Sequence, residues 1–249
     1  MTAAVLVNDE REPLMTITLN RPSSQNRLEV DVVGGIQQAL DRAEAAVGIR
    51  VLAIEAQGDH FCAGMALDAA APDDWQARAT AVRSLLLRLA ESPLVTVALV
   101  NGAAIGGGVG LAAVCDHVIA GPGASFRMPE VLLGLIPALI LPSVARRVGP
   151  QRAYSLALFA DELSGRGAVE IGLADALHDD LRAALRLVTR RIRAADPHAV
   201  RALKRYYADR YEGVPGTAAD PLPPALVARL ADPGFPQRLA EARQAGLLR

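Results

Sequence analysis

Three short segments of the chain combine residue types that can support chemistry. Residues 58–65 (GDHFCAGM) form a tight connection in which Gly64 permits backbone angles that direct N–H groups into a cleft. Residues 101–110 (NGAAIGGGVG) place three consecutive glycines at the start of an expected helix. Residues 125–137 (SFRMPEVLLGLIP) contain a lone carboxylate, Glu130, directly before an apolar stretch. Each segment has a chemical interpretation and a plainer structural one.

The glycine run 106–108 has an energetic cost that something must offset. Each glycine in a helix interior costs about 1 kcal/mol relative to alanine. Close approach of a ligand or another backbone offsets it, or else a free amide at the helix start stabilises developing negative charge. The alternative is a dinucleotide-binding turn, which needs glycines after the first strand and an acid on the next strand. Here the glycines follow the third expected strand, and Asp116 comes too soon.

Glu130 is the acid that the surrounding sequence singles out. Burial would raise its pKa, which suits a general acid or base near neutral pH. Taken alone, a surface or capping glutamate is the commoner explanation of such a residue. Residues 58–65 alone likewise fit an ordinary connection from a strand to a short helix.

The elements that must position these segments follow from hydrophobic periodicity. Strand 94–100 is too apolar for a half-exposed position, which predicts a sheet covered on both faces. The last third is helical, and no internal sequence repeat is evident. We predict an α/β core over residues 1–195 and a helical extension over residues 196–249. The expected strands cover 15–19, 51–54, 94–100 and 117–120; helices cover 28–47, 75–89 and the glycine run to 114, and others begin near 139, 151, 167, 179 and 196.

The composition excludes several classes of protein. Basic and acidic side chains number 26 and 27, for a net charge of -1, which argues against a nucleic-acid partner. The only cysteines, Cys62 and Cys115, allow neither a disulfide framework nor a cysteine-based zinc site, and we expect both to be packing residues. The four histidines lack metal-ligand spacing, so no metal is expected; His60 is interpreted as a loop residue.

Two uncharged runs, 94–115 and 131–145, resemble membrane spans only superficially. The first is interrupted by Asn101-Gly102 and holds five glycines, and the second is short and contains two prolines. The start of the chain lacks the basic region of a secretory signal. We therefore expect a cytoplasmic protein without membrane contact.

Taken together, the three segments occur in the order and spacing of a known family. The chain resembles the crotonase (enoyl-CoA hydratase/isomerase) superfamily over nearly its whole length. The motifs that carry this resemblance are LNRP at 19–22 with Asn26, FCAG at 61–64, the glycines of 101–108, Cys115-Asp116, Phe126, PE at 129–130, GLIP at 134–137 and GLAD at 172–175.

The resemblance implies a core of repeated ββα units and assembly as a trimer or a dimer of trimers, with the C-terminal extension serving trimerisation or active-site capping. It implies an acyl-thioester substrate carried on the phosphopantetheine of CoA or an acyl carrier protein, with no other cofactor. The backbone N–H groups of Met65 and Gly107 would hold an enolate oxygen, and Glu130 would be the acid–base residue. The implied substrate-binding residues are Arg27, Ala63, Gly64, Gly106, Gly110 and Pro137.

Two residues depart from the family pattern. Gly110 stands where many hydratases have a first glutamate, and Ala66 stands where aspartate is common. Because Gly110 cannot do acid–base work, activation of water by paired carboxylates is in doubt. A lone Glu130 could remove an α-proton and then protonate a departing β-hydroxyl group.

A narrower resemblance concerns the dehydratases that install β-branches in polyketide assembly lines. It is carried by residues 135–142, 144–149 and 202–207. It implies dehydration of a 3-hydroxy-3-methylglutaryl group on an acyl carrier protein to the 3-methylglutaconyl form. The alternatives are a catabolic enoyl-CoA hydratase, a Δ-enoyl-CoA isomerase, and a non-catalytic homologue that binds acyl thioesters.

A carrier protein, being acidic, would need a basic docking surface. The candidates are Arg146, Arg147 and Arg152, or Lys204 and Arg205, although arginines at helical spacing usually form a solvated face.

Overall fold

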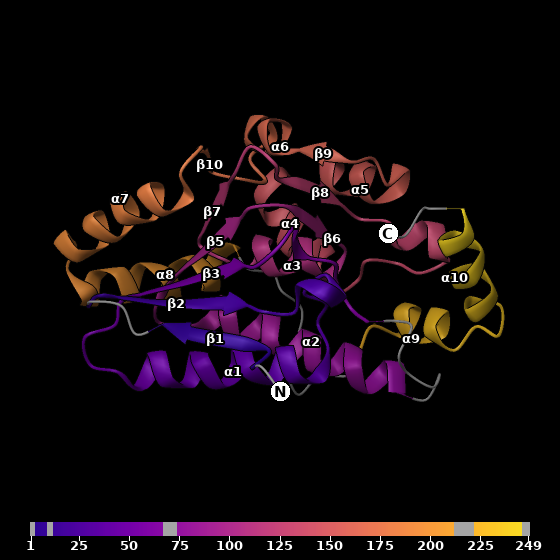
Figure 1. Ribbon diagram of the computed structural model, residues 1–249, viewed down its shortest axis with the longest axis horizontal. Coiled ribbons are helices and arrows are strands. Elements are labelled where there is room, and N and C mark those ends of the chain that lie inside the picture. Colours follow the sequence, from indigo (N-terminus) through magenta and orange to yellow (C-terminus); the bar gives the residue numbers. More distant parts are fainter. Residues whose placement is uncertain (1–2, 9–11, 67–73, 212–221, 246–249) are drawn as a thin grey trace.

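The computed structural model describes residues 3–8, 12–66, 74–211 and 222–245 (Figure 1). In this part of the chain the strands form two sheets, ordered β1-β2-β3-β5-β7-β10 and β4-β6-β8-β9. All neighbouring strands are parallel except the pairs β1–β2 and β8–β9. The strands are β1 (Val5–Asn8), β2 (Leu14–Leu19), β3 (Val51–Ala56), β4 (His60–Cys62), β5 (Val95–Val100), β6 (Ala103–Ile105), β7 (His117–Ala120), β8 (Ser125–Arg127), β9 (Leu163–Ser164) and β10 (Ala176–Leu177).

Helices follow most of the strands and make up most of the described residues in the last third of the chain. None of the described helices is long and apolar enough to cross a membrane. The helices are η1 (Pro22–Ser24), α1 (Val30–Ala45), α2 (Asp74–Glu91), α3 (Gly107–Ala113), η2 (Glu130–Leu133), α4 (Leu141–Val148), α5 (Pro150–Phe159), α6 (Gly165–Ile171), α7 (Leu181–Ala194), α8 (Pro197–Tyr211), α9 (Pro224–Leu230) and α10 (Phe235–Gln244).

A unit of two strands and a helix is repeated along the core. β3, β4 and α2 form one unit, β5, β6 and α3 the next, and β7, β8 and α4 a third. In each unit the first strand joins the six-stranded sheet and the second joins the four-stranded sheet. The predicted α/β fold with a crotonase-like core of ββα units is therefore confirmed.

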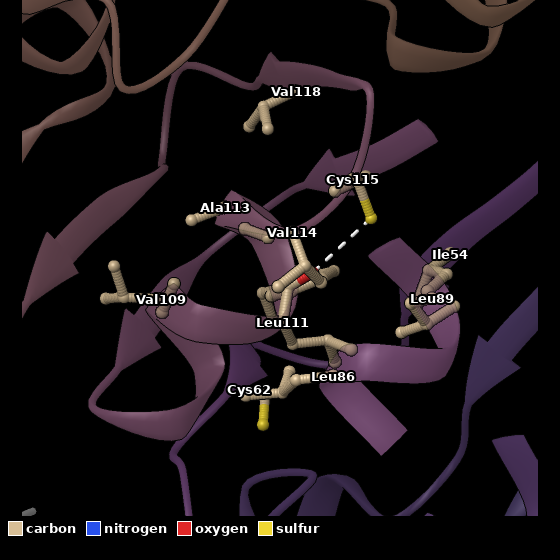
Figure 2. Close-up of a cluster of buried hydrophobic side chains, with 14 of the residues drawn as sticks. Ile54, Cys62, Leu86, Leu89, Val109, Leu111, Ala113, Val114, Cys115 and Val118 are labelled. Atoms are coloured by element: carbon tan, nitrogen blue, oxygen red, sulfur yellow. Dashed lines mark hydrogen bonds between the residues drawn. The ribbon is translucent and has the colours of Figure 1, made fainter. Parts of the chain in front are cut away.

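The six-stranded sheet is covered on both faces, as the apolar strand 94–100 predicts. Every residue of β5 is buried. Val97 and Leu99 pack on one face against Leu185 of α7, whereas Ala98 and Val100 belong to the main core with α1, α2 and α3. Figure 2 shows Leu111 of α3 close to Leu86 and Cys62, in the same cluster as Cys115.

Several elements differ from the expectations. The long strands and helices lie within a few residues of their predicted positions, but the strands β1, β4, β6, β8, β9 and β10 were not predicted. The segment 58–65 contains β4, so His60 begins a strand rather than lying in a loop. Met65 makes an isolated parallel bridge with Leu28 where a short helix was expected to begin. The sequence DPLPP at 220–224 predicts a local linker before a terminal helix; residues 220 and 221 lie outside the described residues, and α9 begins at Pro224.

The last two helices form a second hydrophobic cluster, apart from the main core. Leu226 and Leu230 of α9 and Leu239 of α10 pack with Trp75 of α2 and with η2. The rings of Trp75 and Phe235 meet edge to face with centroids 4.5 Å apart, a geometry that adds about 0.5–1.5 kcal/mol beyond area burial. In Figure 1, α9 and α10 lie at the opposite end of the molecule from α7 and α8.

Replacing Phe235 by alanine should loosen α9 and α10 selectively. Phe235 is fully buried, and truncation of a buried phenylalanine costs about 3–5 kcal/mol. Because this cluster is separate from the main core, we expect hydrogen exchange in α9 and α10 to accelerate by about 100-fold or more while the amides of β5 and α3 keep their protection. The control is Val47→Ala, since the Val47 side chain is fully exposed in the loop after α1. Equal acceleration in every element would contradict the separation of the two clusters.

Candidate active site

Three neighbouring parallel strands end beside one another, and each leads into one of the chemically interesting segments. β4 pairs with β6 and β6 with β8, all in parallel, so their carboxyl ends meet at one edge of the sheet. Gly64 and Met65 follow β4, Gly106 and Gly107 follow β6, and Glu130 lies three residues beyond β8. The sheet thus brings together residues far apart in the sequence.

The turns after β4 and β6 touch through their backbones. A Cβ atom on Gly64 would lie 2.7 Å from the Ile105 carbonyl oxygen and 3.0 Å from the Gly107 amide nitrogen. A Cβ atom on Gly107 would lie 3.4 Å from the Met65 amide nitrogen. Gly64 and Gly106 both have positive φ, +78° and +52°, which side chains disfavour. Among the described residues, neither the Met65 nor the Gly107 N–H donates to a backbone carbonyl.

The carboxyl group of Glu130 lies against this pair of turns. Its Oε1 would be 3.0 Å from a Cβ atom on Gly106. Its Oε2 is shielded from solvent and has no hydrogen-bond partner in the described part of the chain. Desolvation of the carboxyl group raises the pKa of Glu130 to about 7, although a bond from its own backbone N–H acts in the opposite direction. A carboxyl group with this pKa can both accept and donate a proton near neutral pH.

These groups open into a cavity of about 450 Å³. The cavity wall contains all but one of the residues that sequence analysis assigned to the site: Arg27, Ala63, Gly64, Met65, Gly106, Gly107, Glu130 and Pro137. The exception is Gly110, which is buried in α3 outside the wall. The side chain of Ile140 covers Gly110 and is itself part of the wall. The expected position of Gly110 in the substrate-binding surface is therefore wrong for this structure.

Aliphatic side chains from distant parts of the sequence form much of the wall. Ala79 and Val82 of α2, Leu226 and Leu230 of α9, and Leu239 of α10 all contribute. The sequence of these helices indicates no substrate contact, because each shows only the amphipathic pattern of a core helix.

The remaining charged and titratable groups of the wall include Arg127, His60 and Arg243. Arg127 donates from Nε to the Ala160 carbonyl. Burial lowers the pKa of His60, with Asp59 raising it and Arg27 lowering it further. No pattern in the sequence indicated that Arg127 or Arg243 lines the site, and His60 was expected in a loop.

Two groups of candidate residues have structural roles instead. Burial raises the pKa of the Cys62 and Cys115 thiols to about 12, so both remain protonated packing residues. Among the described residues, no cluster of side chains is suited to a metal ion. Arg147 donates to the Ala113 and Cys115 carbonyls, and Lys204 binds Asp116. These two residues are therefore not available as a docking surface, in contrast to one sequence-based interpretation.

Comparison with known proteins identifies the family. The family model described as enoyl-CoA hydratase/isomerase matches residues 9–219, so the chain belongs to that family. The bacillaene synthase dehydratase PksH of Bacillus subtilis is 29% identical over 195 residues, which cover 76% of this chain and 75% of that protein. The resemblance to the crotonase superfamily is thereby confirmed.

Two further relatives show the extent of the match. Enoyl-CoA hydratase ACTT6 of Alternaria alternata is 32% identical over 186 residues, which cover 74% of this chain and 62% of that protein. The chain therefore matches less than two thirds of that relative's length. The crystal structure of an enoyl-CoA hydratase from Mycobacterium avium superimposes with a TM-score of 0.84 at 25% identity, over 98% of both chains.

The raised pKa of Glu130 predicts a pH-dependent free energy of unfolding. The ordinary value is 4.5 and the folded value about 7, so the folded state binds this proton more tightly than the unfolded state. Stability from this group is therefore present below about pH 4.5 and is lost as pH rises through about 7, by up to about 3 kcal/mol. The free energy of unfolding of Glu130→Gln lacks this pH dependence. Relative to that of the wild type, it should therefore increase by up to about 3 kcal/mol between about pH 5 and about pH 8.

Urea denaturation at both pH values measures this difference. Glu170→Gln is the matched control, because Glu170 is exposed on α6 and should give a constant difference. A Glu130→Gln difference that is equally constant would show that the carboxyl group is not desolvated in the fold.

Proposed function

We propose that this protein is a hydro-lyase that dehydrates a 3-hydroxyacyl thioester through an enolate, the substrate being 3-hydroxy-3-methylglutaryl on an acyl carrier protein. The observation that carries the proposal is the Glu130 carboxyl group held against two glycine turns whose Met65 and Gly107 amides point to no backbone acceptor in the described chain. The relative PksH is named as a dehydratase of bacillaene synthase, which supports the assignment to dehydration on an acyl carrier protein.

The proposed reaction uses one carboxyl group for two proton transfers. Glu130 as carboxylate removes the α-proton, and the electron pair moves onto the thioester oxygen. The Met65 and Gly107 amides donate to this oxygen as it gains charge. Each such donor contributes about 3–4 kcal/mol to lowering the barrier. Glu130, now protonated, donates to the β-hydroxyl group; the C–O bond breaks, water leaves, and the double bond forms between the α and β carbons.

The cavity supports an acyl group with an apolar middle and a charged end. Aliphatic residues of α2, α9 and α10 suit the methyl-branched carbon chain, and Arg243 lies one helical turn after Leu239 on the cavity face of α10. A glutaryl-type group ends in a carboxylate, which an arginine can bind with two hydrogen bonds. In this proposal the C-terminal extension caps the acyl end of the site.

Assembly and partner remain part of the proposal. Apolar side chains are exposed on α5 (Leu158 and Phe159) and on α8 (Leu203), which is compatible with a trimer or a dimer of trimers. Arg152 and Arg205 are exposed and remain candidates for contact with an acidic carrier protein in the cytoplasm.

The first experiment offers 3-hydroxy-3-methylglutaryl groups on an acyl carrier protein and on CoA, and follows the acyl mass over time. We expect loss of water, faster from the carrier-bound form. Glu130→Gln should lower the rate by about 100-fold to 10,000-fold, while Glu170→Gln should not. Rapid hydration of crotonyl-CoA with no loss of water from either form would favour a general hydratase, and acyl-thioester binding without turnover would favour the non-catalytic alternative.

Arg243→Met tests the substrate class separately. The methionine keeps the apolar stem of the side chain but loses the cation, so we expect KM to rise about tenfold or more for the 3-hydroxy-3-methylglutaryl thioester. KM for a 3-hydroxybutyryl thioester, which has no distal carboxylate, should stay the same. Equal effects on both substrates would contradict a carboxylate-binding role for Arg243.

A further inference from the structure

The side chain of Ile140 fills the space into which any side chain at position 110 would project. A Cβ atom on Gly110 would lie 2.2 Å from Cγ2 and 2.9 Å from Cβ of Ile140. Leu86 closes the other side, with its Cδ1 3.4 Å from the same point. Ile140 and Gly110 are both buried, but only Ile140 forms part of the cavity wall.

The covered position lies close to the reacting groups. The Gly110 N–H donates to the Gly106 carbonyl at 3.2 Å, so Gly110 is about one helical turn, about 6 Å, further along α3. Gly106 itself touches the Glu130 carboxyl group. A longer side chain at Gly110, with Ile140 absent, would therefore project into the cavity within reach of the same substrate carbons.

We propose that Ile140 is a specificity-determining residue, which commits the site to Glu130 as its single acid–base group by filling the space over Gly110. This inference rests on the proposed dehydration and deepens it. Glu130 takes the α-proton and returns it to the leaving hydroxyl group, so no second carboxylate polarises water on the α3 side. The aliphatic surface of Ile140 there also offers water no hydrogen-bond partner.

Glu162 is the other carboxylate among the described residues of the cavity wall. It is exposed and directly precedes β9, and the antiparallel pairing of β8 with β9 places it near Arg127 at the carboxyl end of β8. His60 also lines the wall, so the pH profile of kcat/KM is measured with His60→Gln present throughout. There the proposal requires a single ionisation, which adding Glu162→Gln leaves in place. Disappearance of a second ionisation in that variant would overturn the proposal.

The decisive experiment is a pair of substitutions tested singly and together. Gly110→Glu alone should misfold or melt at a lower temperature, because its Cβ meets Ile140. Gly110→Glu combined with Ile140→Gly should fold and should hydrate a crotonyl thioester at least tenfold faster than Ile140→Gly alone. The rate of hydration is measured from the loss of absorbance of the conjugated thioester. Its pH profile should gain a second ionisation. Leu139→Gly with Gly110→Glu is the matched control and should not restore folding, since Leu139 lines the cavity but the atoms nearest to a Cβ on Gly110 belong to Ile140 and Leu86.

A second measurement separates failure of this inference from failure of the proposed function. Exchange of the α-protons of a butyryl thioester in heavy water needs Glu130 and the two amides but no elimination. A double variant that exchanges α-protons yet shows neither faster hydration nor a second ionisation overturns the role of Ile140. Absence of exchange in the wild-type protein, together with no dehydration, overturns the proposed function instead.

Discussion

The contact between the two backbone turns after β4 and β6 is the constraint on which the site depends. Gly64 lies so close to Ile105 and Gly107 that a methyl group on it would overlap a carbonyl oxygen. The contact places the Met65 and Gly107 amides next to each other and leaves Glu130 at the edge of the same turn. It also explains why a helix begins with glycines at a cost of about 1 kcal/mol each: the adjoining backbone needs the space.

α3 is a poor helix by its own composition, and contacts from outside hold it in place. It spans seven residues, from Gly107 to Ala113, well below the length at which an isolated helix is stable. The β4 turn packs against its first residue. At its other end Arg147, whose side chain is only 8% exposed, donates to the Ala113 carbonyl at 2.9 Å and pairs with Asp175 at 3.0 Å. The position of the Gly107 amide therefore depends on tertiary contacts at both ends of α3.

The sequence predicted the large elements well because their apolar patterns are long. The strand 94–100 and the helix 28–47 were placed within about two residues of β5 and α1. The strands β4, β6 and β8 are three residues long, too short for a periodic signal, and yet they align the site. Family resemblance supplied what periodicity did not, namely that Gly64, Gly107 and Glu130 belong together. The aliphatic wall from α9 and α10 and the cover of Ile140 over Gly110 depend on packing between segments distant in sequence, which local patterns do not contain.

Packing around the cavity also determines the free energy of ionising Glu130. A desolvated carboxyl group destabilises the fold when it ionises, and nothing in the described chain offers Oε2 of Glu130 a partner that would reduce this cost. Hydrophobic packing elsewhere in the fold must supply the compensating stability. The pKa near 7 that results lets one residue act as base and then as acid within a single turnover. A wall that is apolar at Ile140 is consistent with this arrangement, since a second charged carboxylate beside Glu130 would raise the cost of ionising either one. In this proposal the glycine at 110 and the isoleucine at 140 act as one feature of the site, because the side chain of one fills the space that the other leaves.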